Sequence, residues 1–197
     1  MEFYSKKIQL PKNAIEDVFS NFKSGTKFLV FGLGHDSKMW YNGNAETYFV
    51  ENKDEFIKLN EKDIPKTNII KYDYKNISLK ISKELSDEAI SKFKVPDELL
   101  QLAPFDIILI DGPEGQAPEK PGRLLPYYWV KFLSKSGTII YTDDSRRPYE
   151  SYFINKYFKN KAKSMDLGKA WLPPNSIITT IPLRERQKTS RVCKIIY

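Results

Sequence analysis

Acidic side chains follow four apolar runs of this sequence, each with the character of a buried strand. Glu51 and Asp73 follow two of these runs, Asp111 ends a third, and Asp143 with Asp144 ends a fourth. Because the carboxyl ends of parallel strands meet at one edge of a sheet, we expect these acids to converge there. Carboxylates gathered in this way can act as general bases, accept hydrogen bonds from hydroxyl groups or bind hard divalent cations.

A glycine turn precedes the acids in the sequence. Residues 27–31 are mostly apolar and run into a Gly-Leu-Gly turn, after which the sequence is helical in character. This pattern predicts a buried strand that feeds a helix N-terminus, where backbone N–H groups can approach a ligand. Glu51 lies about 20 residues further on, where nucleoside-binding βαβ units place an acid on the ribose hydroxyls. The predicted cofactor-binding residues are Gly32, Leu33, Gly34, His35, Ser37, Glu51, Asn52, Tyr72, Asp73 and Asp111.

The turn suits S-adenosylmethionine better than a dinucleotide. Ser37 stands where the dinucleotide pattern has its third glycine, and Asp36 would place a negative charge beside a pyrophosphate. The cationic groups of S-adenosylmethionine tolerate nearby acids. A nicotinamide oxidoreductase is an alternative, since Tyr127 and Lys131 have the Tyr-x-x-x-Lys spacing of short-chain dehydrogenases. These two residues, however, lie in the helix before the fifth strand, whereas those enzymes place them after it.

Methyl transfer to an alcohol needs a general base, or a metal ion that lowers the pKa of the hydroxyl. We expect Asp111, Asp143 and Asp144 to be catalytic and to be candidate ligands of Mg²⁺, Mn²⁺ or Co²⁺. The open alternative is a single carboxylate base, Asp111, without metal. The loop after Asp111 is rich in glycine and proline, and in it Glu114 and Arg123 are predicted to contact the substrate.

The order of the elements predicts how these residues are positioned. Strands alternate with helices, which favours an α/β fold with a mostly parallel sheet in one domain over residues 1–197. Strands are expected at residues 27–31, 47–50, 68–72, 105–110 and 137–141, followed by an antiparallel hairpin of residues 176–181 and 192–197. Helices are expected at residues 11–22, 54–59, 86–93, 124–133 and 148–158. The predicted fold is a Rossmann-like class I methyltransferase fold, with seven strands and helices on both faces.

Composition narrows the class of protein. Of 197 residues, 41% are hydrophobic and 29% charged, no apolar run approaches the length of a membrane span, and no signal peptide is visible. We therefore expect a soluble cytoplasmic protein. The single histidine, His35, excludes a histidine-rich zinc site. The net charge of +7 is spread along the chain without a nucleic-acid recognition motif, so no nucleic-acid partner is expected. A non-catalytic nucleic-acid-binding module remains an alternative, and the sequence indicates no oligomeric state.

Several motifs together resemble one known family. Residues 28–40, with the segment FLVFGLGHDS, look like the signature of the glucuronoxylan methyltransferase (DUF579) family. The segments at residues 50–52, 72–73, 106–115 and 117–123 follow the order of that family. The resemblance implies an S-adenosylmethionine-dependent O-methyltransferase that acts on a sugar hydroxyl of a glycan or polysaccharide. Plant members methylate the 4-hydroxyl of glucuronic acid on xylan, with help from a divalent metal.

The resemblance also implies site residues. It places cofactor contacts on Gly32, Gly34, Ser37 and Glu51, and catalysis near Asp111. The sequence departs from the family where residues 142–143, Thr-Asp, replace a His-Asp pair after the fifth strand. Plant members also carry an N-terminal membrane anchor, for which this sequence shows no apolar segment. The identity of the acceptor is left open, and RNA or a small hydroxylated molecule is the alternative to a glycan.

Overall fold

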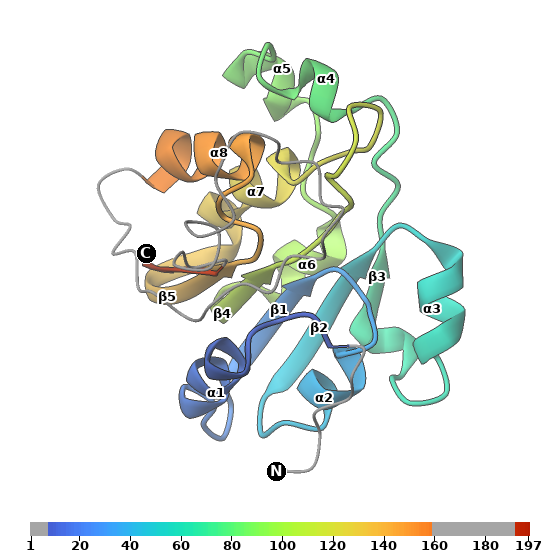
Figure 1. Ribbon diagram of the computed structural model, residues 1–197. Helices are drawn as coiled ribbons and strands as arrows, with labels where there is room; N and C mark the ends of the chain where they lie inside the picture. The colour runs from blue at the N-terminus through green and yellow to red at the C-terminus, as the bar shows by residue number, and fades with distance from the viewer. Residues whose placement is uncertain (1–7, 159–191) are drawn as a thin grey trace, which may run out of the picture.

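The structure, a computed structural model, describes residues 8–158 and 192–197 and shows one mixed sheet within them (Figure 1). The described strands form a six-stranded sheet in the order β3-β2-β1-β4-β5-β6. Neighbouring strands are parallel except β5 and β6, which are antiparallel. The strands are β1 (Lys27–Phe31), β2 (Glu46–Glu51), β3 (Ile69–Lys71), β4 (Phe105–Ile110), β5 (Ser134–Thr142) and β6 (Cys193–Ile196).

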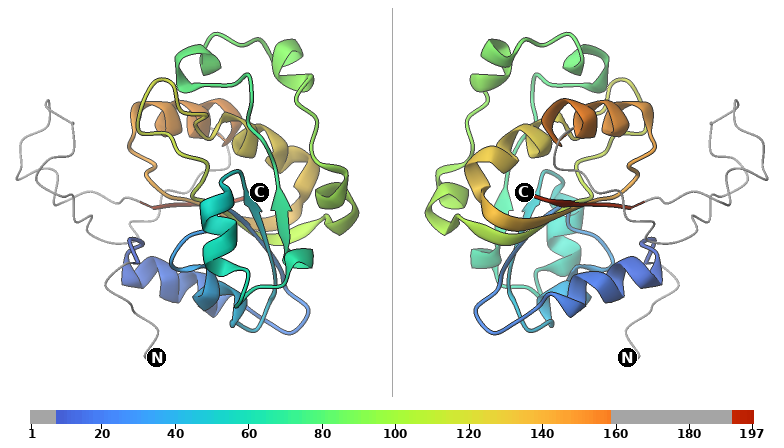
Figure 2. Two further views of the ribbon diagram at one scale, coloured as in Figure 1. Left: turned by 90° about the vertical axis from the view of Figure 1, so that its right-hand side faces the viewer. Right: turned by 90° about the vertical axis from the view of Figure 1, so that its left-hand side faces the viewer.

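Helices cover both faces of the sheet. Figure 2 shows α1 and α2 on one side and α7 and α8 on the other, and each group packs on its own hydrophobic core. The helices are α1 (Lys12–Ser20), α2 (Ser37–Tyr41), α3 (Asp54–Asn60), α4 (Leu79–Ser82), α5 (Asp87–Ser91), α6 (Asp97–Leu102), α7 (Leu124–Leu133) and α8 (Pro148–Phe158), with a 3₁₀ turn η1 (Lys66–Asn68) before β3. No helix in the described part of the chain is long and apolar enough to cross a bilayer.

The central strand β1 shows why the sequence forms this sheet. Its side chains alternate between the two cores: Phe28 and Val30 pack on the side of α1, and Leu29 and Phe31 on the side of α7. A strand that is buried on both faces has a continuous apolar run as its sequence. The register pairs Phe31 with Ile110 of β4, so the two strands end at the same level and the residues after them are neighbours.

The predicted fold class is confirmed, with differences at particular elements. The predicted bounds of β1, β4, α7 and α8 agree with the structure. β5 begins at Ser134, earlier than predicted, because α7 passes directly into it. The predicted helix at 86–93 is shorter, and α4 and α6 flank it. The predicted strand at residues 176–181 lies outside the described residues, and within them β6 pairs with β5.

Candidate functional site

A cavity of about 260 Å³ lies at the carboxyl ends of the central strands. Its walls come from the turn after β1, the end of β2, the loop after β4 and the residues after β5. This is the edge at which open α/β sheets bind ligands. Of the residues predicted from the sequence, those that line the cavity are Gly32, Leu33, Gly34, Glu51, Asn52, Asp111, Glu114, Arg123 and Asp144.

The other predicted cofactor residues lie outside this lining. His35 is exposed, and Ser37 is buried with its hydroxyl accepting a bond from the backbone. Tyr72 packs edge-on against the Trp129 ring at 4.8 Å between centroids. The Asp73 carboxylate forms a surface ion pair with a lysine two residues on. Their roles as cofactor contacts stay predictions.

The N–H groups of the glycine turn are used by the protein itself. Gly32 N–H donates to the Val50 carbonyl (2.9 Å), and Leu33 N–H donates to Glu51 Oε2 (2.9 Å). Gly34 N–H donates to the Ser37 hydroxyl (2.8 Å). These three donors therefore already have acceptors within the protein, and a role of the turn in binding an anionic group stays a prediction.

Two glycines let the ends of β1 and β4 approach each other. Gly32 has a φ of +113°, a conformation that side chains rarely adopt. A Cβ atom on Gly112 would lie 2.8 Å from Gly32 Cα, which is backbone and cannot rotate away. The close approach places Asp111 beside the glycine turn, so these glycines shape the site through packing between strands.

Glu51 is buried at the end of β2, with 6% of its surface exposed. Its Oε1 accepts bonds from the N–H groups of Asn52 (2.7 Å) and Lys53 (2.8 Å), and its Oε2 accepts the single bond from Leu33. Burial raises the pKa of Glu51, while these backbone bonds act in the opposite direction. Glu51 lines the cavity, and its Oε2 keeps capacity for a further donor.

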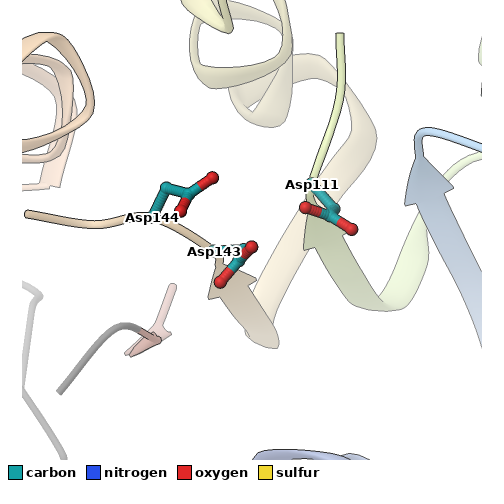
Figure 3. Close-up of side chains that lie close together, drawn as sticks. All are labelled: Asp111, Asp143 and Asp144. Atoms are coloured by element: carbon teal, nitrogen blue, oxygen red, sulfur yellow. The ribbon is translucent and has the colours of Figure 1, made fainter. Parts of the chain in front are cut away.

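Figure 3 shows that three aspartates come together where β4 and β5 end. Oxygen atoms of Asp111, Asp143 and Asp144 lie within 4.8 Å of one another, as the sequence predicted. Asp143 is 1% exposed, and the side chain of Asp144 is 10% exposed. The Asp111 side chain is 34% exposed and lines the cavity, so it is the member of the cluster that a ligand reaches most easily.

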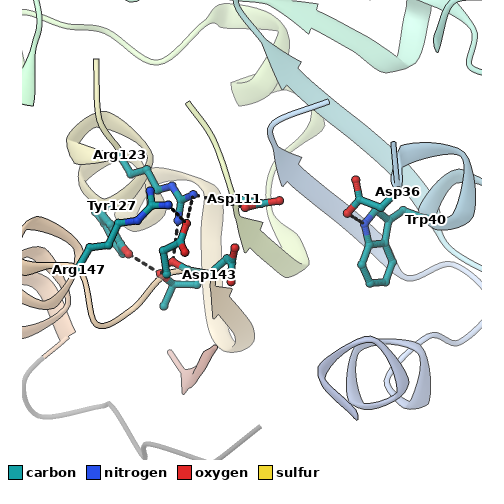
Figure 4. Close-up of polar contacts among 9 residues, drawn as sticks. Asp36, Trp40, Asp111, Arg123, Tyr127, Asp143 and Arg147 are labelled. Atoms are coloured by element: carbon teal, nitrogen blue, oxygen red, sulfur yellow. Dashed lines mark hydrogen bonds and ion pairs between the residues drawn. The ribbon is translucent and has the colours of Figure 1, made fainter. Parts of the chain in front are cut away.

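The Arg123 guanidinium lies inside this cluster (Figure 4). Its Nη1 donates to the backbone carbonyl of Asp143 (2.6 Å), and its Nη2 donates to Asp144 (3.1 Å) and Asp111 (3.4 Å). A second arginine, Arg147, contacts Asp144 at 2.9 Å. Arg123 was predicted to bind the substrate; it lines the cavity but is only 4% exposed, and these three contacts favour a role in positioning the aspartates.

The same contacts test whether the aspartates fit a divalent ion. Two of the three carboxylates already bind Arg123, and a guanidinium stays charged at every accessible pH. A divalent ion on the same oxygens would lie next to this fixed positive charge and be repelled by it. The cluster therefore fits arginine as its counter-ion, and it does not fit a metal ion shared by all three carboxylates.

Burial and charge act on Asp111 in opposite directions. Burial raises its pKa above the ordinary value, Arg123 lowers it, and the negative charges of Asp36 and Asp144 raise it. Asp36 turns toward α2, where it accepts a bond from the Trp40 indole N–H (2.8 Å), as Figure 4 shows. The net effect brings the Asp111 carboxyl closer to the pKa that suits a general base.

An ion pair that the sequence did not predict crosses the rim of the cavity. Lys53, which follows β2, pairs with Glu114 in the loop after β4. Lys120 reaches Glu114 from the same loop at 3.0 Å. Lys53 holds the pKa of Glu114 below its ordinary value. Both partners line the cavity, but 61 residues separate them, so no local sequence signal connects them.

Known proteins similar to this chain were found at the level of sequence and of fold. A sequence model described as IRX15/IRX15L/GXM matches residues 13–94. The chain is 27% identical over 171 residues to arabinogalactan O-methyltransferase 2 of Arabidopsis thaliana, covering 73% of this chain and 58% of that protein. It is 31% identical over 153 residues to glucuronoxylan 4-O-methyltransferase 2 of the same plant, covering 66% of this chain and 53% of that protein. The chain thus spans little more than half the length of these relatives.

Among solved structures, an O-methyltransferase from Bacillus cereus in complex with SAH superposes with a TM-score of 0.47 at 14% sequence identity. The superposition covers 94% of this chain and 78% of that one.

The contact between Gly32 and Gly112 leads to a stability prediction. Gly112→Ala forces a Cβ against backbone at 2.8 Å, so it should lower the free energy of unfolding by about 1–3 kcal/mol. Denaturant unfolding measures this loss. Gly25→Ala is the control, because Gly25 has a positive φ but no atom within 4 Å of the added Cβ, and it should show backbone strain alone. Equal, small losses in both variants would contradict the packing argument.

Proposed function

We propose that this chain, which is similar to the family described by the IRX15/IRX15L/GXM model, is an S-adenosylmethionine-dependent O-methyltransferase acting on a sugar hydroxyl of a glycan. The observation that carries this proposal is one cavity with Glu51 on one wall and Asp111 on the other. The curated relatives are named as O-methyltransferases of arabinogalactan and of glucuronoxylan, which supports the choice of acceptor class.

The residues of the cavity suit a cationic nucleoside cofactor. When bound, S-adenosylmethionine supplies an electrophilic methyl group. Glu51 Oε2 has capacity to accept a ribose hydroxyl, and its other oxygen is fixed by two backbone N–H groups. Val30 and Phe56 give the cavity apolar wall for a base. Asp36 and Asp111 also line the cavity, and their carboxylates favour a positive charge.

Asp111 is the proposed general base. A sugar hydroxyl is a poor nucleophile at neutral pH, so a carboxylate must take its proton as the oxygen attacks. Asp111 is the most exposed aspartate of the cluster, and Arg123 bonds one of its oxygens and thereby fixes its orientation. Asp143 and Asp144 hold Arg123 through a carbonyl and a carboxylate, so their proposed part in catalysis is to position the arginine.

The charges around the cavity favour a glycan over a nucleic acid. The basic residues that line it, Lys53, Arg123 and Arg147, each form ion pairs with acidic side chains. Basic side chains bind a phosphate backbone by displacing the counter-ions of the nucleic acid. The three basic side chains of this cavity are already neutralised by acidic partners. A neutral or singly charged sugar is therefore the better acceptor for this site.

Calorimetry with purified protein tests cofactor binding. We expect S-adenosylhomocysteine to bind and NAD not to bind. Glu51→Gln should weaken S-adenosylhomocysteine binding at least about tenfold, because the amide loses a charged acceptor for the ribose and faces backbone donors with its own N–H₂. Glu55→Gln is the matched control, since Glu55 has a side chain that is 71% exposed. Unchanged affinity in folded Glu51→Gln protein would remove Glu51 from the cofactor site.

Turnover of Asp111→Asn tests the base. The substitution keeps the shape of the side chain and removes its charge, so kcat should fall by about 10²–10⁴-fold while the melting temperature changes little. A glycan screen with a labelled methyl donor supplies the acceptor for this measurement. Asp106→Asn, at the other end of β4, should retain turnover. Near-native kcat in Asp111→Asn would show that the base lies elsewhere.

Chelation tests the counter-ion. Because Arg123 already compensates the aspartates, activity should be retained after dialysis against EDTA and should not rise when Mg²⁺, Mn²⁺ or Co²⁺ is added. The assay is the same labelled methyl transfer, before and after chelation. Activity that is lost in EDTA and restored by one of these ions would contradict the role given to Arg123 and support the metal site that the aspartates alone predicted.

A further inference from the structure

A fourth acid lies behind the aspartate cluster, and neither the sequence motifs nor the proposed mechanism uses it. Glu150 is in the first turn of α8 and is 1% exposed. Neither of its carboxylate oxygens has a hydrogen-bond partner among the described residues. Burying a carboxylate without a partner is costly. A buried acid of this kind calls for an explanation.

The backbone around Glu150 makes room for its carboxylate. A Cβ atom on Gly115 would lie 3.1 Å from Glu150 Oε1 and 3.5 Å from Gly122 Cα. The loop that carries both glycines is fixed against α4, where the N–H groups of Leu79 and Lys80 donate to its carbonyls at 2.8 and 3.0 Å. Glu150 is thus enclosed beneath the loop that leads from Asp111 to Arg123.

Arg123 Nε is a buried donor that suits a carboxylate acceptor such as Glu150. This atom is also buried, and it has no hydrogen-bond partner among the described residues. The two Nη atoms of the same guanidinium bind the aspartate cluster, so Nε is the edge that remains. Burial raises the pKa of Glu150, and the positive charge of Arg123 is the strongest of the influences that lower it.

We propose that Glu150 is a positioning residue, whose carboxylate holds the Nε edge of Arg123 through one water molecule, while the aspartates hold its Nη edge. A guanidinium held on both edges has one orientation, and Arg123 in turn orients Asp111. The contact between Glu150 and Arg123 does not depend on what the protein does. Its effect on turnover rests on the proposed function.

The kinetic test compares Glu150→Gln with Glu98→Gln, which makes the same change in the first turn of α6 at an exposed position. Glu150→Gln should lower kcat about tenfold and leave the dissociation constant of S-adenosylhomocysteine within about twofold, because Glu150 does not line the cavity. Its melting temperature should stay close to that of the wild type, because the glutamine oxygen can still accept a hydrogen bond and Arg123 keeps its aspartate partners. Glu98→Gln should change none of these quantities.

A purely structural role gives a different pattern. It would lower the melting temperature of Glu150→Gln and leave the kcat of the folded protein unchanged, and this result would overturn the proposal. The double variant measures the coupling between Glu150 and Arg123. In an Arg123→Lys background, Glu150→Gln should lower kcat by a smaller factor than it does in the wild type, because lysine has no Nε–H group for Glu150 to hold. An equal fold loss of kcat in the two backgrounds would also overturn the proposal.

A crystal structure of the wild-type chain decides the contact without reference to activity. We expect a Glu150 oxygen and Arg123 Nε to be bonded to the same water molecule, each within about 3.2 Å of it. A Glu150 carboxylate bonded to other groups, with Nε elsewhere, would refute the inference even in an active enzyme. Wild-type protein that neither binds S-adenosylhomocysteine nor transfers methyl groups would refute the proposed function, and the crystal structure would still decide the role of Glu150.

Discussion

The arrangement of the site depends on the burial of one permanent positive charge. Arg123 begins the segment that becomes α7, and its guanidinium is nearly inaccessible to water. A buried charge is tolerated only when acids and hydrogen-bond acceptors surround it. Those acceptors come from the ends of β4 and β5, so the pairing of Arg123 with Asp111 and Asp144 fixes two strand ends and one helix relative to each other.

Among the described residues, five carboxylates line the cavity, and they influence the kind of ligand that it suits. The N–H groups of the turn after β1 are directed to Val50, Glu51 and Ser37, so the turn does not offer the row of donors that a pyrophosphate needs. Asp36 and Asp111 both line the cavity. A cofactor with a positive charge and ribose hydroxyls matches such walls better than an anionic dinucleotide does.

Two separate contacts hold together the segments at the carboxyl ends of the strands. Backbone contact between Gly32 and Gly112 brings β1 and β4 together, and the ion pair of Lys53 with Glu114 joins the loops above them. The first contact is steric and leaves no freedom, whereas the second is a partly exposed ion pair of modest strength. Close backbone packing therefore forms the base of the cavity, and a partly exposed ion pair joins its rim.

The sequence by itself determined the architecture and the location of the site. The bounds of β1, β4, α7 and α8 could be predicted because strands buried on both faces, and helices after glycine- or proline-rich turns, leave continuous local signals. The convergence of Asp111, Asp143 and Asp144 followed from the rule that parallel strands end at one edge. Only the tertiary structure decided which groups bond one another there: that Arg123 enters the aspartate cluster, that the turn is closed by its own acceptors, and that Glu150 lies behind them. These pairings join residues from different strands and loops. Their energies depend on burial and distance, and neither can be predicted from the periodicity of the sequence.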